Sequence, residues 1–350
     1  MTQLWTKEVP TQCGPVRGFI QNGMRQFLGI PYARAQVGGL RWKPPQPHAG
    51  WTKPLDAFEF GPSCAQNARL HGISAPSGSE DGLSLNVFSP VDTEARKLPV
   101  MVWIHGGGLF GGTSAGHDPS LLVKLGRTVF VSINYRLNLF GFFAHSALVD
   151  EGGPCANYGI MDQQFALRWI QDNIEAFGGD PGCVTIFGES GGATAVLALL
   201  VSPLSAGLFH RAIVQSSNIW SRSLITLENA KRVAEAFCKE ADCEQSASAL
   251  RALPVNQILS INRAGPRFQE IAGKYSVAVI RDGYVIPEQI HDALATGRFN
   301  RMPVMRGTNR DEFSWFVGLE ELSTGRVLAA EDYIMRLRGL FGTRDRKSVV

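Results

Sequence analysis

The stretch that decides the fold is GDPGCVTIFGESGGATAVLALL, residues 179–200. It runs from a Gly/Asp/Pro turn through a short apolar segment to Ser190, and then into an alanine-rich segment. An exposed nucleophile needs so tight a backbone turn that side chains two positions away would clash, so glycine is required there. The stretch therefore predicts a strand, a nucleophile elbow at Ser190, and a helix whose first N–H groups face a developing oxyanion.

Strand-like and helix-like segments alternate on both sides of this stretch. Apolar runs predict buried strands, and apolar residues at helical spacing predict helices. The predicted strands are residues 98–105, 127–135, 183–188, 211–217 and 302–308, and the predicted helices are residues 158–177 and 191–201. This order favours a mostly parallel sheet that is covered by helices on both faces, which is an α/β fold.

The segments outside this core differ from it in composition. Residues 1 to about 60 are rich in Gly, Pro and aromatic residues, which predicts short strands and turns without a long helix. Residues 221–300 are more polar, and we expect a helical insertion over the strand ends. We expect one catalytic domain over residues 1–343.

Composition narrows the classes of partner. The 350 residues include 34 basic and 31 acidic side chains, so the net charge of +3 offers no concentrated basic face for nucleic acid. The first 19 residues lack the pattern of a secretory signal, and the most apolar windows are broken or too short to span a bilayer. We therefore expect a soluble, cytoplasmic protein without a membrane partner.

Six cysteines are scattered without a CxxC pair or a nearby histidine, so no metal site is expected. Most are expected to be buried free thiols. Cys238 and Cys243 are close enough in sequence to form a disulfide, and the sequence does not decide between a bridge and a helix that carries reduced thiols. Reduced thiols are favoured.

Two further elements support a catalytic reading of Ser190. His105 and the glycines 106–108 directly follow a predicted strand, the placement of an oxyanion loop. Asp311 and Glu312 follow a later strand, and in this type of fold the acid comes after the serine along the chain. Each element has a plainer alternative: a chance turn at Ser190, a glycine loop without function, and a solvated charge run at residues 309–312.

Together these motifs resemble the type B carboxylesterases, the cholinesterase and para-nitrobenzyl esterase family of α/β-hydrolases. The likeness covers nearly the whole chain and rests on FLGIPYA (27–33), LRWKPPQP (40–47), SEDGLSLNVFSP (79–90), WIHGGG (103–108), the long block 157–193 and GTNRDEF (307–313). The resemblance implies a serine carboxylesterase that acts on a small-molecule ester through an acyl-enzyme, with no cofactor.

The resemblance also implies a role for each matching residue. Ser190 is the nucleophile, and Glu312 rather than Asp311 is the triad acid. The oxyanion hole is formed by the N–H groups of Gly107, Gly108 and Gly191. Glu189 is a buried carboxylate that modulates the site, and our expected pocket walls are Leu109, Phe110 and Trp220.

Other matches imply structure rather than catalysis. Glu80 is expected to pair with Arg41, and Arg136 with Asp162, because a buried pair mainly avoids an unpaired charge. Gly82 stands where secreted members carry a cysteine. Cys64 therefore lacks its family partner, which fits a bacterial-type, intracellular enzyme.

The triad base is missing from the expected place. All seven histidines precede Glu312, whereas the family order puts the base after the acid. The end of the chain, DRKSVV, resembles the translation of a sequencing adapter, although an ordinary basic tail is the alternative. We therefore expect a gene fragment that is cut near Thr343 and incomplete at its C-terminus, with a non-native tail over residues 344–350.

A second function of another class is a non-catalytic cholinesterase-like binding protein. In such a protein the fold presents a surface and the catalytic site has decayed. The presence of Ser190, the three glycines and Glu312 together argues against this reading. The sequence predicts neither the oligomeric state nor the acyl and alcohol groups of the substrate.

Overall fold

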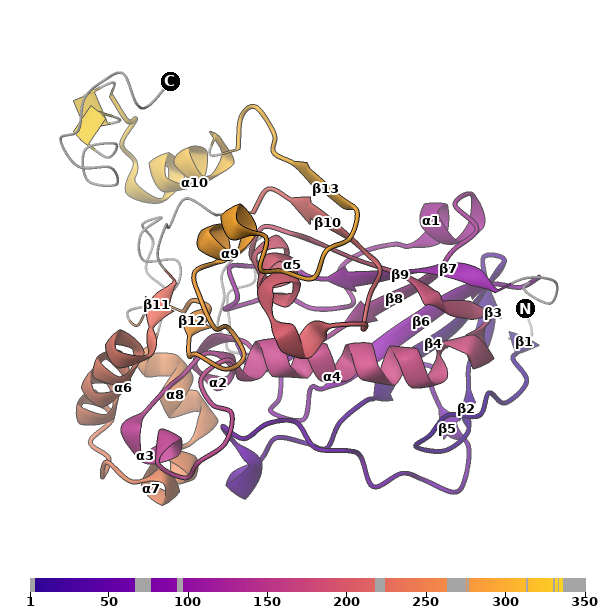
Figure 1. The fold of residues 1–350 in the computed structure, drawn as a ribbon, viewed down its shortest axis with the longest axis horizontal. Helices are drawn as coiled ribbons and strands as arrows, with labels where there is room; N and C mark the ends of the chain where they lie inside the picture. Colours follow the sequence, from indigo (N-terminus) through magenta and orange to yellow (C-terminus); the bar gives the residue numbers. More distant parts are fainter. Residues whose placement is uncertain are drawn as a thin grey trace.

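The computed structural model describes residues 4–66, 77–92, 97–217, 224–262, 275, 277–312, 314–329, 331–332 and 334–335. Within these residues one nine-stranded sheet runs through the molecule (Figure 1). Its strands, in spatial order, are β1 (Leu4–Trp5), β3 (Phe19–Gln21), β4 (Met24–Pro31), β6 (Ser84–Pro90), β8 (Val129–Ile133), β7 (Leu98–Ile104), β9 (Gly179–Glu189), β10 (Arg211–Gln215) and β13 (Val304–Gly307).

The sheet has a parallel part and an antiparallel part. The strands β8, β7, β9, β10 and β13 pair in parallel, as the alternation of strands and helices predicts. The N-terminal strands β1, β3, β4 and β6 continue the same sheet in antiparallel pairs. A separate short parallel pair joins β2 (Val16–Arg17) to β5 (Leu55–Asp56). The predicted α/β architecture is confirmed, with antiparallel strands added along one side.

Residues of β7 alternate between two apolar clusters because successive side chains of a strand point to opposite faces. Val100, Val102 and Ile104 are fully buried in the main core, which also contains residues of α4 (Tyr158–Asn173) and α5 (Gly191–Val201). Trp103 belongs to a smaller cluster with Val123 of α1 (Ser120–Lys124). The two faces of the sheet are thus covered by different helices.

The two long helices of the core form where the sequence predicts them. In α4 the apolar residues recur at helical spacing. The chain leaves α4 through the 3-10 turn η3 (Ile174–Phe177), and Gly178 ends that turn with a φ of 91°. Ten of the eleven residues of α5 are buried, so α5 is a central helix rather than a surface one.

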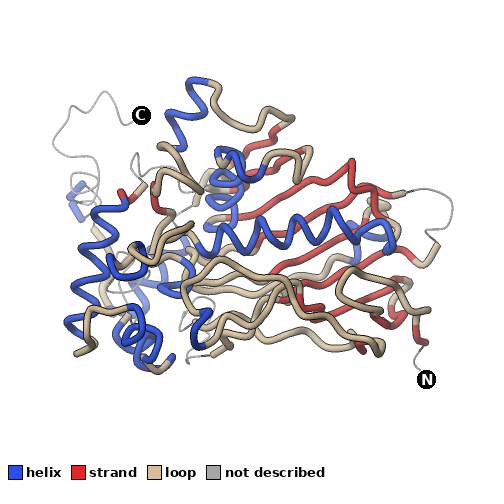
Figure 2. The backbone as a smooth tube through the Cα atoms, turned by 60° about the horizontal axis from the view of Figure 1, so that its bottom comes forward, coloured by secondary structure: helices blue, strands red, loops and turns tan. Residues whose placement is uncertain are grey.

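Between β10 and β13 helices are the main regular structure of the described residues. These residues form α6 (Leu227–Glu240), α7 (Ala247–Ala252), α8 (Val255–Ile261), α9 (Ile290–Thr296) and the parallel pair β11 (Ile225–Thr226) and β12 (Ile280–Arg281). Figures 1 and 2 show α6, α7 and α8 gathered beyond one end of the sheet, beside α2 (Asn138–Gly141) and α3 (Ser146–Val149). This is the end at which the parallel strands finish.

The remaining elements are short or follow the sheet. They are η1 (Gly38–Leu40), η4 (Pro203–Ser205) and α10 (Ser314–Thr324). No helix in the described part of the chain is both long and apolar enough to cross a bilayer. The expected tail over residues 344–350 lies outside the described residues.

All six cysteines are free thiols in the structure. Cys238 lies near the end of α6 and Cys243 lies in the turn beyond it. Their Sγ atoms are 2.8 Å apart, longer than a disulfide bond of about 2.05 Å. Cys238 is therefore a reduced thiol on helix α6, and the thiol of Cys243 lies beside it without a bridge.

Candidate active site

Ser190 occupies a strained backbone turn between β9 and α5. Its φ of 53° and ψ of −118° lie in a region that residues with a side chain rarely adopt. The Ser190 N–H donates to the carbonyl oxygen of Gln215, the last residue of β10, at 2.9 Å. The Ser190 carbonyl oxygen accepts from the N–H of Thr194 at 3.0 Å. The predicted change from strand to helix at this serine is confirmed.

The glycines around Ser190 are required by close backbone contacts. A methyl group on Gly192 would lie 2.1 Å from the carbonyl oxygen of Ile104, the last residue of β7. A methyl group on Gly188 would lie 2.8 Å from the same oxygen and 2.6 Å from the carbonyl carbon of Gly192. The first turn of α5 therefore approaches the end of β7 with only backbone between them.

The glycine loop after β7 packs against the start of α5. A methyl group on Gly191 would lie 2.8 Å from the backbone nitrogens of Gly108 and Leu109. Gly107 has a φ of 105°, and Gly108 and Leu109 have φ values of 64° and 66°. The structure thus brings the backbone nitrogens of the predicted oxyanion loop to the residue that follows Ser190.

His105 is buried at the start of this loop. Its ring stacks on Tyr135 with 4.5 Å between centroids, and the Tyr135 hydroxyl donates to the His105 carbonyl oxygen at 2.7 Å. The His105 Nδ1 contacts the Gly106 carbonyl oxygen at 2.9 Å. Burial lowers the pKa of His105 to about 4, so the ring is neutral near pH 7.

Glu312 joins the site through a serine that the sequence analysis missed. The Ser216 hydroxyl and the Asn309 N–H each donate to Glu312 Oε1 at 2.5 Å. Ser216 directly follows Gln215 and has a φ of 53°, and its N–H donates to the Gly307 carbonyl oxygen at 2.8 Å. The available signal was its place directly after β10, which pairs with β9, the strand that leads into Ser190.

Asp311, the other carboxylate of this pair, is exposed. It forms an ion pair with the neighbouring Arg310 at 3.3 Å, in which both side chains are mostly in solvent. The geometry therefore brings Glu312, and not Asp311, to the strand that binds the Ser190 backbone.

One expectation at this site is wrong. Glu189 is exposed rather than buried, because it is the last residue of β9 at the open end of the sheet. Leu109 and Phe110 are buried in the main core, and their role as pocket walls stays a prediction. Trp220 lies outside the described residues.

Among the described residues no histidine hydrogen-bonds to Ser190 or Glu312. The other five described histidines have local contacts: His48 accepts from Gly50, His117 packs on Trp103, His145 caps α3, His210 accepts from Val184, and His291 pairs with Asp292. His71 lies outside the described residues.

Residues 6–335 match the model of the carboxylesterase family. The chain belongs to the carboxylesterase family. The resemblance inferred from its motifs is thereby confirmed.

Individual relatives in the carboxylesterase family align along nearly the whole chain. It is 41% identical to fumonisin B1 esterase of Sphingopyxis macrogoltabida, over 93% of this chain and 59% of that protein. It is 38% identical to para-nitrobenzyl esterase of Bacillus subtilis, over 93% of this chain and 68% of that protein. A solved PNB esterase superimposes with a TM-score of 0.82 and 36% identity, over 96% of this chain and 69% of that one.

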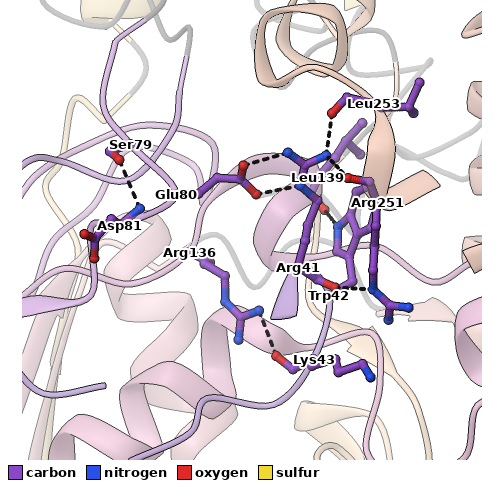
Figure 3. Close-up of polar contacts among 10 residues, drawn as sticks. All are labelled: Arg41, Trp42, Lys43, Ser79, Glu80, Asp81, Arg136, Leu139, Arg251 and Leu253. Atoms are coloured by element: carbon purple, nitrogen blue, oxygen red, sulfur yellow. Dashed lines mark hydrogen bonds and ion pairs between the residues drawn. The ribbon is translucent and has the colours of Figure 1, made fainter. Parts of the chain in front are cut away.

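The two buried ion pairs that the carboxylesterase resemblance implies are both present. Arg136 binds Asp162 through two guanidinium nitrogens at 2.7 and 2.8 Å, and both side chains are almost fully buried. Arg41 binds both oxygens of Glu80 at 2.6 Å. Figure 3 shows that Arg41 also donates to the carbonyl oxygens of Arg251 and Leu253.

Arg41 therefore links the N-terminal part of the carboxylesterase fold to the helices between β10 and β13. Its guanidinium binds the end of α7, and Arg251 donates back to the Arg41 carbonyl oxygen at 2.8 Å. A small cavity of about 10 Å³ lies beside the pairs, with Arg41, Glu80 and Arg136 in its wall, and it has room for about one water molecule. Ser190 is not among the residues that line this cavity.

Proposed function

We propose that this protein hydrolyses carboxylic esters by a serine mechanism, with a small-molecule ester as substrate. Ser190 attacks the ester carbonyl carbon, the alcohol leaves, and water then releases the acyl group from the serine. The observation that carries the proposal is the strained backbone of Ser190 at the start of α5. Membership of the carboxylesterase family supports it.

The oxyanion of the tetrahedral intermediate is held by backbone N–H groups in this proposal. The donors are those of Gly107, Gly108 and Gly191. The backbone nitrogens of Gly108 and Leu109 lie 2.8 Å from the methyl position of Gly191, which supports Gly108 and Gly191 as neighbouring donors, whereas Gly107 is carried over from the family motif. The N-terminus of α5 adds its positive dipole end beside the same position.

Glu312 is the proposed triad acid. In a triad the carboxylate orients the base histidine and stabilises its charged form. The hydrogen bonds from Ser216 and Asn309 fix one Glu312 oxygen at the end of β10, the strand whose Gln215 carbonyl oxygen binds the Ser190 N–H. The other Glu312 oxygen is left for an imidazole N–H. We propose that none of the seven histidines of this chain is the base.

The chain covers 59% of the length of fumonisin B1 esterase. The proposed activity is therefore tested in a chimaeric protein that has the full length of a relative. A chimaera joins residues 1–335 of this chain to the part of para-nitrobenzyl esterase that this chain does not match. We expect a fluorophosphonate probe to label Ser190 of the chimaera, as peptide mass spectrometry detects, and not to label a Ser190→Ala chimaera.

The 350-residue chain is tested beside the chimaera with short-chain nitrophenyl esters. Without a base we expect only the residual catalysis of an oxyanion hole, about 10³ to 10⁴ over water. Turnover equal to that of the chimaera would identify one of the seven histidines as the base. A folded chimaera that neither reacts with the probe nor cleaves esters would instead favour a cholinesterase-like binding protein.

A further inference from the structure

The backbone of the oxyanion loop is hydrogen-bonded at Leu109 to Asn138, the first residue of α2. Leu109 follows two glycines with positive φ and itself has a φ of 66°, which is costly for a residue with a side chain. Such a conformation persists only where neighbouring groups determine it. The Leu109 carbonyl oxygen accepts from the N–H of Asn138, the first residue of α2, at 2.8 Å.

Asn138 has an unusual conformation of its own. Its φ is 56°, a region that asparagine tolerates better than most residues, and its side chain is buried. The Asn138 Oδ1 accepts from the N–H of Leu139 at 2.8 Å and from the Nδ2 of Asn262 at 2.6 Å. The first bond keeps the side chain against its own helix, and the second reaches a distant part of the chain.

Asn262 lies at the end of α8, 124 residues away along the sequence. It is as buried as Asn138, and its Oδ1 accepts from the N–H of Tyr275 at 2.7 Å. The hydrogen bonds thus form a continuous buried path from α8 through the two asparagines to the carbonyl of Leu109. Figure 1 shows α8 and α2 side by side at this end of the sheet.

We propose that Asn262 is a positioning residue of the oxyanion loop, which acts through Asn138 to fix the backbone that carries the N–H groups of Gly107 and Gly108. A buried amide that loses its partner costs more than the mean worth of one hydrogen bond. Loss of the Asn262 amide therefore lets Asn138 and the Leu109 carbonyl shift together. The structural link is independent of catalysis, whereas its effect on catalysis rests on the proposed function.

The test is hydrogen–deuterium exchange of the peptide that contains residues 105–112, measured in the 350-residue chain. Asn262→Ala should speed exchange of these amides by about five- to tenfold, the effect of losing roughly one buried hydrogen bond. Asn138→Gly keeps the positive φ and the N–H bond to Leu109 but removes the acceptor, so it should do the same without unfolding the chain. The double variant should be no worse than either single one.

The matched control is Asn173→Ala. Asn173 is also buried, accepts from the Gln12 N–H at 2.7 Å and donates to the Trp169 carbonyl oxygen at 2.8 Å, but it lies at the end of α4. We expect this variant to lower thermal stability without faster exchange at residues 105–112. Unchanged exchange in Asn138→Gly, or equal acceleration in Asn173→Ala, would overturn the proposal.

A second readout tests the catalytic consequence in the chimaera. Asn138→Gly should lower the rate of fluorophosphonate labelling at Ser190 and lower kcat by about fivefold or more, with KM little changed. If the chimaera is folded and the probe labels neither it nor its variants, the proposed function fails while the exchange result still decides the link. If exchange accelerates but labelling and kcat stay normal, Asn262 stabilises the loop without positioning its donors, and the proposal is wrong.

Discussion

The nucleophile half and the acid half of the proposed site are held in different ways. Ser190 and the loop 105–112 lie among β7, β9 and α5, where several glycines have no room for a methyl group. Glu312 follows β13, the last strand of the described sheet, whose four residues are all exposed. The first half is fixed by backbone enclosure, whereas the second is fixed by two hydrogen bonds.

This difference predicts which substitutions change both activity and the free energy of unfolding, and which change activity alone. Changes in the enclosed half must disturb packing or relieve strain, so they change the free energy of unfolding as well as activity. Changes at Glu312 remove only hydrogen bonds of a half-buried side chain, so activity alone should change. The following predictions test this contrast.

The largest effect is expected at Ser190. In the chimaera, Ser190→Ala and Ser190→Gly should each lower kcat by about 10⁶ for nitrophenyl esters. In the 350-residue chain, Ser190→Gly should raise the free energy of unfolding by about 1–3 kcal/mol, because glycine relieves the positive φ. Urea denaturation measures this gain. Activity in either variant would contradict the role proposed for Ser190. A Ser190→Gly variant that is no more stable than Ser190→Ala would contradict the claim that the Ser190 backbone is strained.

Glu312→Gln should have the next largest effect. Loss of the triad carboxylate lowers kcat by about 10⁴ when the geometry is kept. The free energy of unfolding should change by less than about 1 kcal/mol, since the side chain is half-buried. Asp311→Asn is the matched control and should keep full activity. If Asp311→Asn loses activity and Glu312→Gln does not, Asp311 and not Glu312 is the triad acid.

Gly107→Ala tests the oxyanion loop. The added methyl group would lie 2.2 Å from the Gly111 carbonyl oxygen, at a φ of 105°. The loop must then move, and loss of one oxyanion donor costs about 10² to 10³ in kcat. Gly116→Ala is the control, because its nearest neighbour would be 3.7 Å away and its φ is not positive. Equal kcat in the two variants would remove this loop from catalysis.

The smallest effect is a pH dependence of stability that comes from His105. Its native pKa of about 4 lies below the ordinary 6.5, so the unfolded chain takes up the proton first as the pH falls. Its contribution is complete above pH 6.5 and declines between pH 6.5 and pH 4. We expect about 2 kcal/mol of stability to be lost from this group between pH 7 and pH 5.

Urea denaturation of the 350-residue chain at both pH values measures this loss. His105→Gln should flatten the difference between pH 7 and pH 5. The exposed His291, which pairs with Asp292, provides the control variant His291→Gln, and that variant should behave as the parent chain does. Parallel curves for all three proteins would mean that another group carries the pH dependence.

The sequence predicts the parts of this molecule that local physics determines. Apolar runs and helical periodicity give β7, β8, β9, α4 and α5, and the glycine pattern gives the turn at Ser190. The family motifs also give the buried pairs Arg41–Glu80 and Arg136–Asp162.

Contacts between distant segments could not be read in the same way. The hydrogen bond from Ser216 to Glu312 spans 96 residues, and that from Asn262 to Asn138 spans 124. Nothing near these polar residues in the sequence distinguishes them from ordinary turn residues. Glu189 was predicted to be buried and is exposed. Its burial depends on which distant elements pack over the end of β9, and the local sequence does not show this.

The contact between the start of α5 and the end of β7 has a consequence for protein engineering. Gly188 and Gly192 meet the Ile104 carbonyl oxygen through backbone alone, so no side chain sets the distance from Ser190 to the sheet. A library that varies side chains around the serine while it keeps these two glycines would leave the Ser190 backbone in place, and under the proposed function it would change substrate preference alone. A library that randomises either glycine would mostly yield chains in which the serine has lost its place.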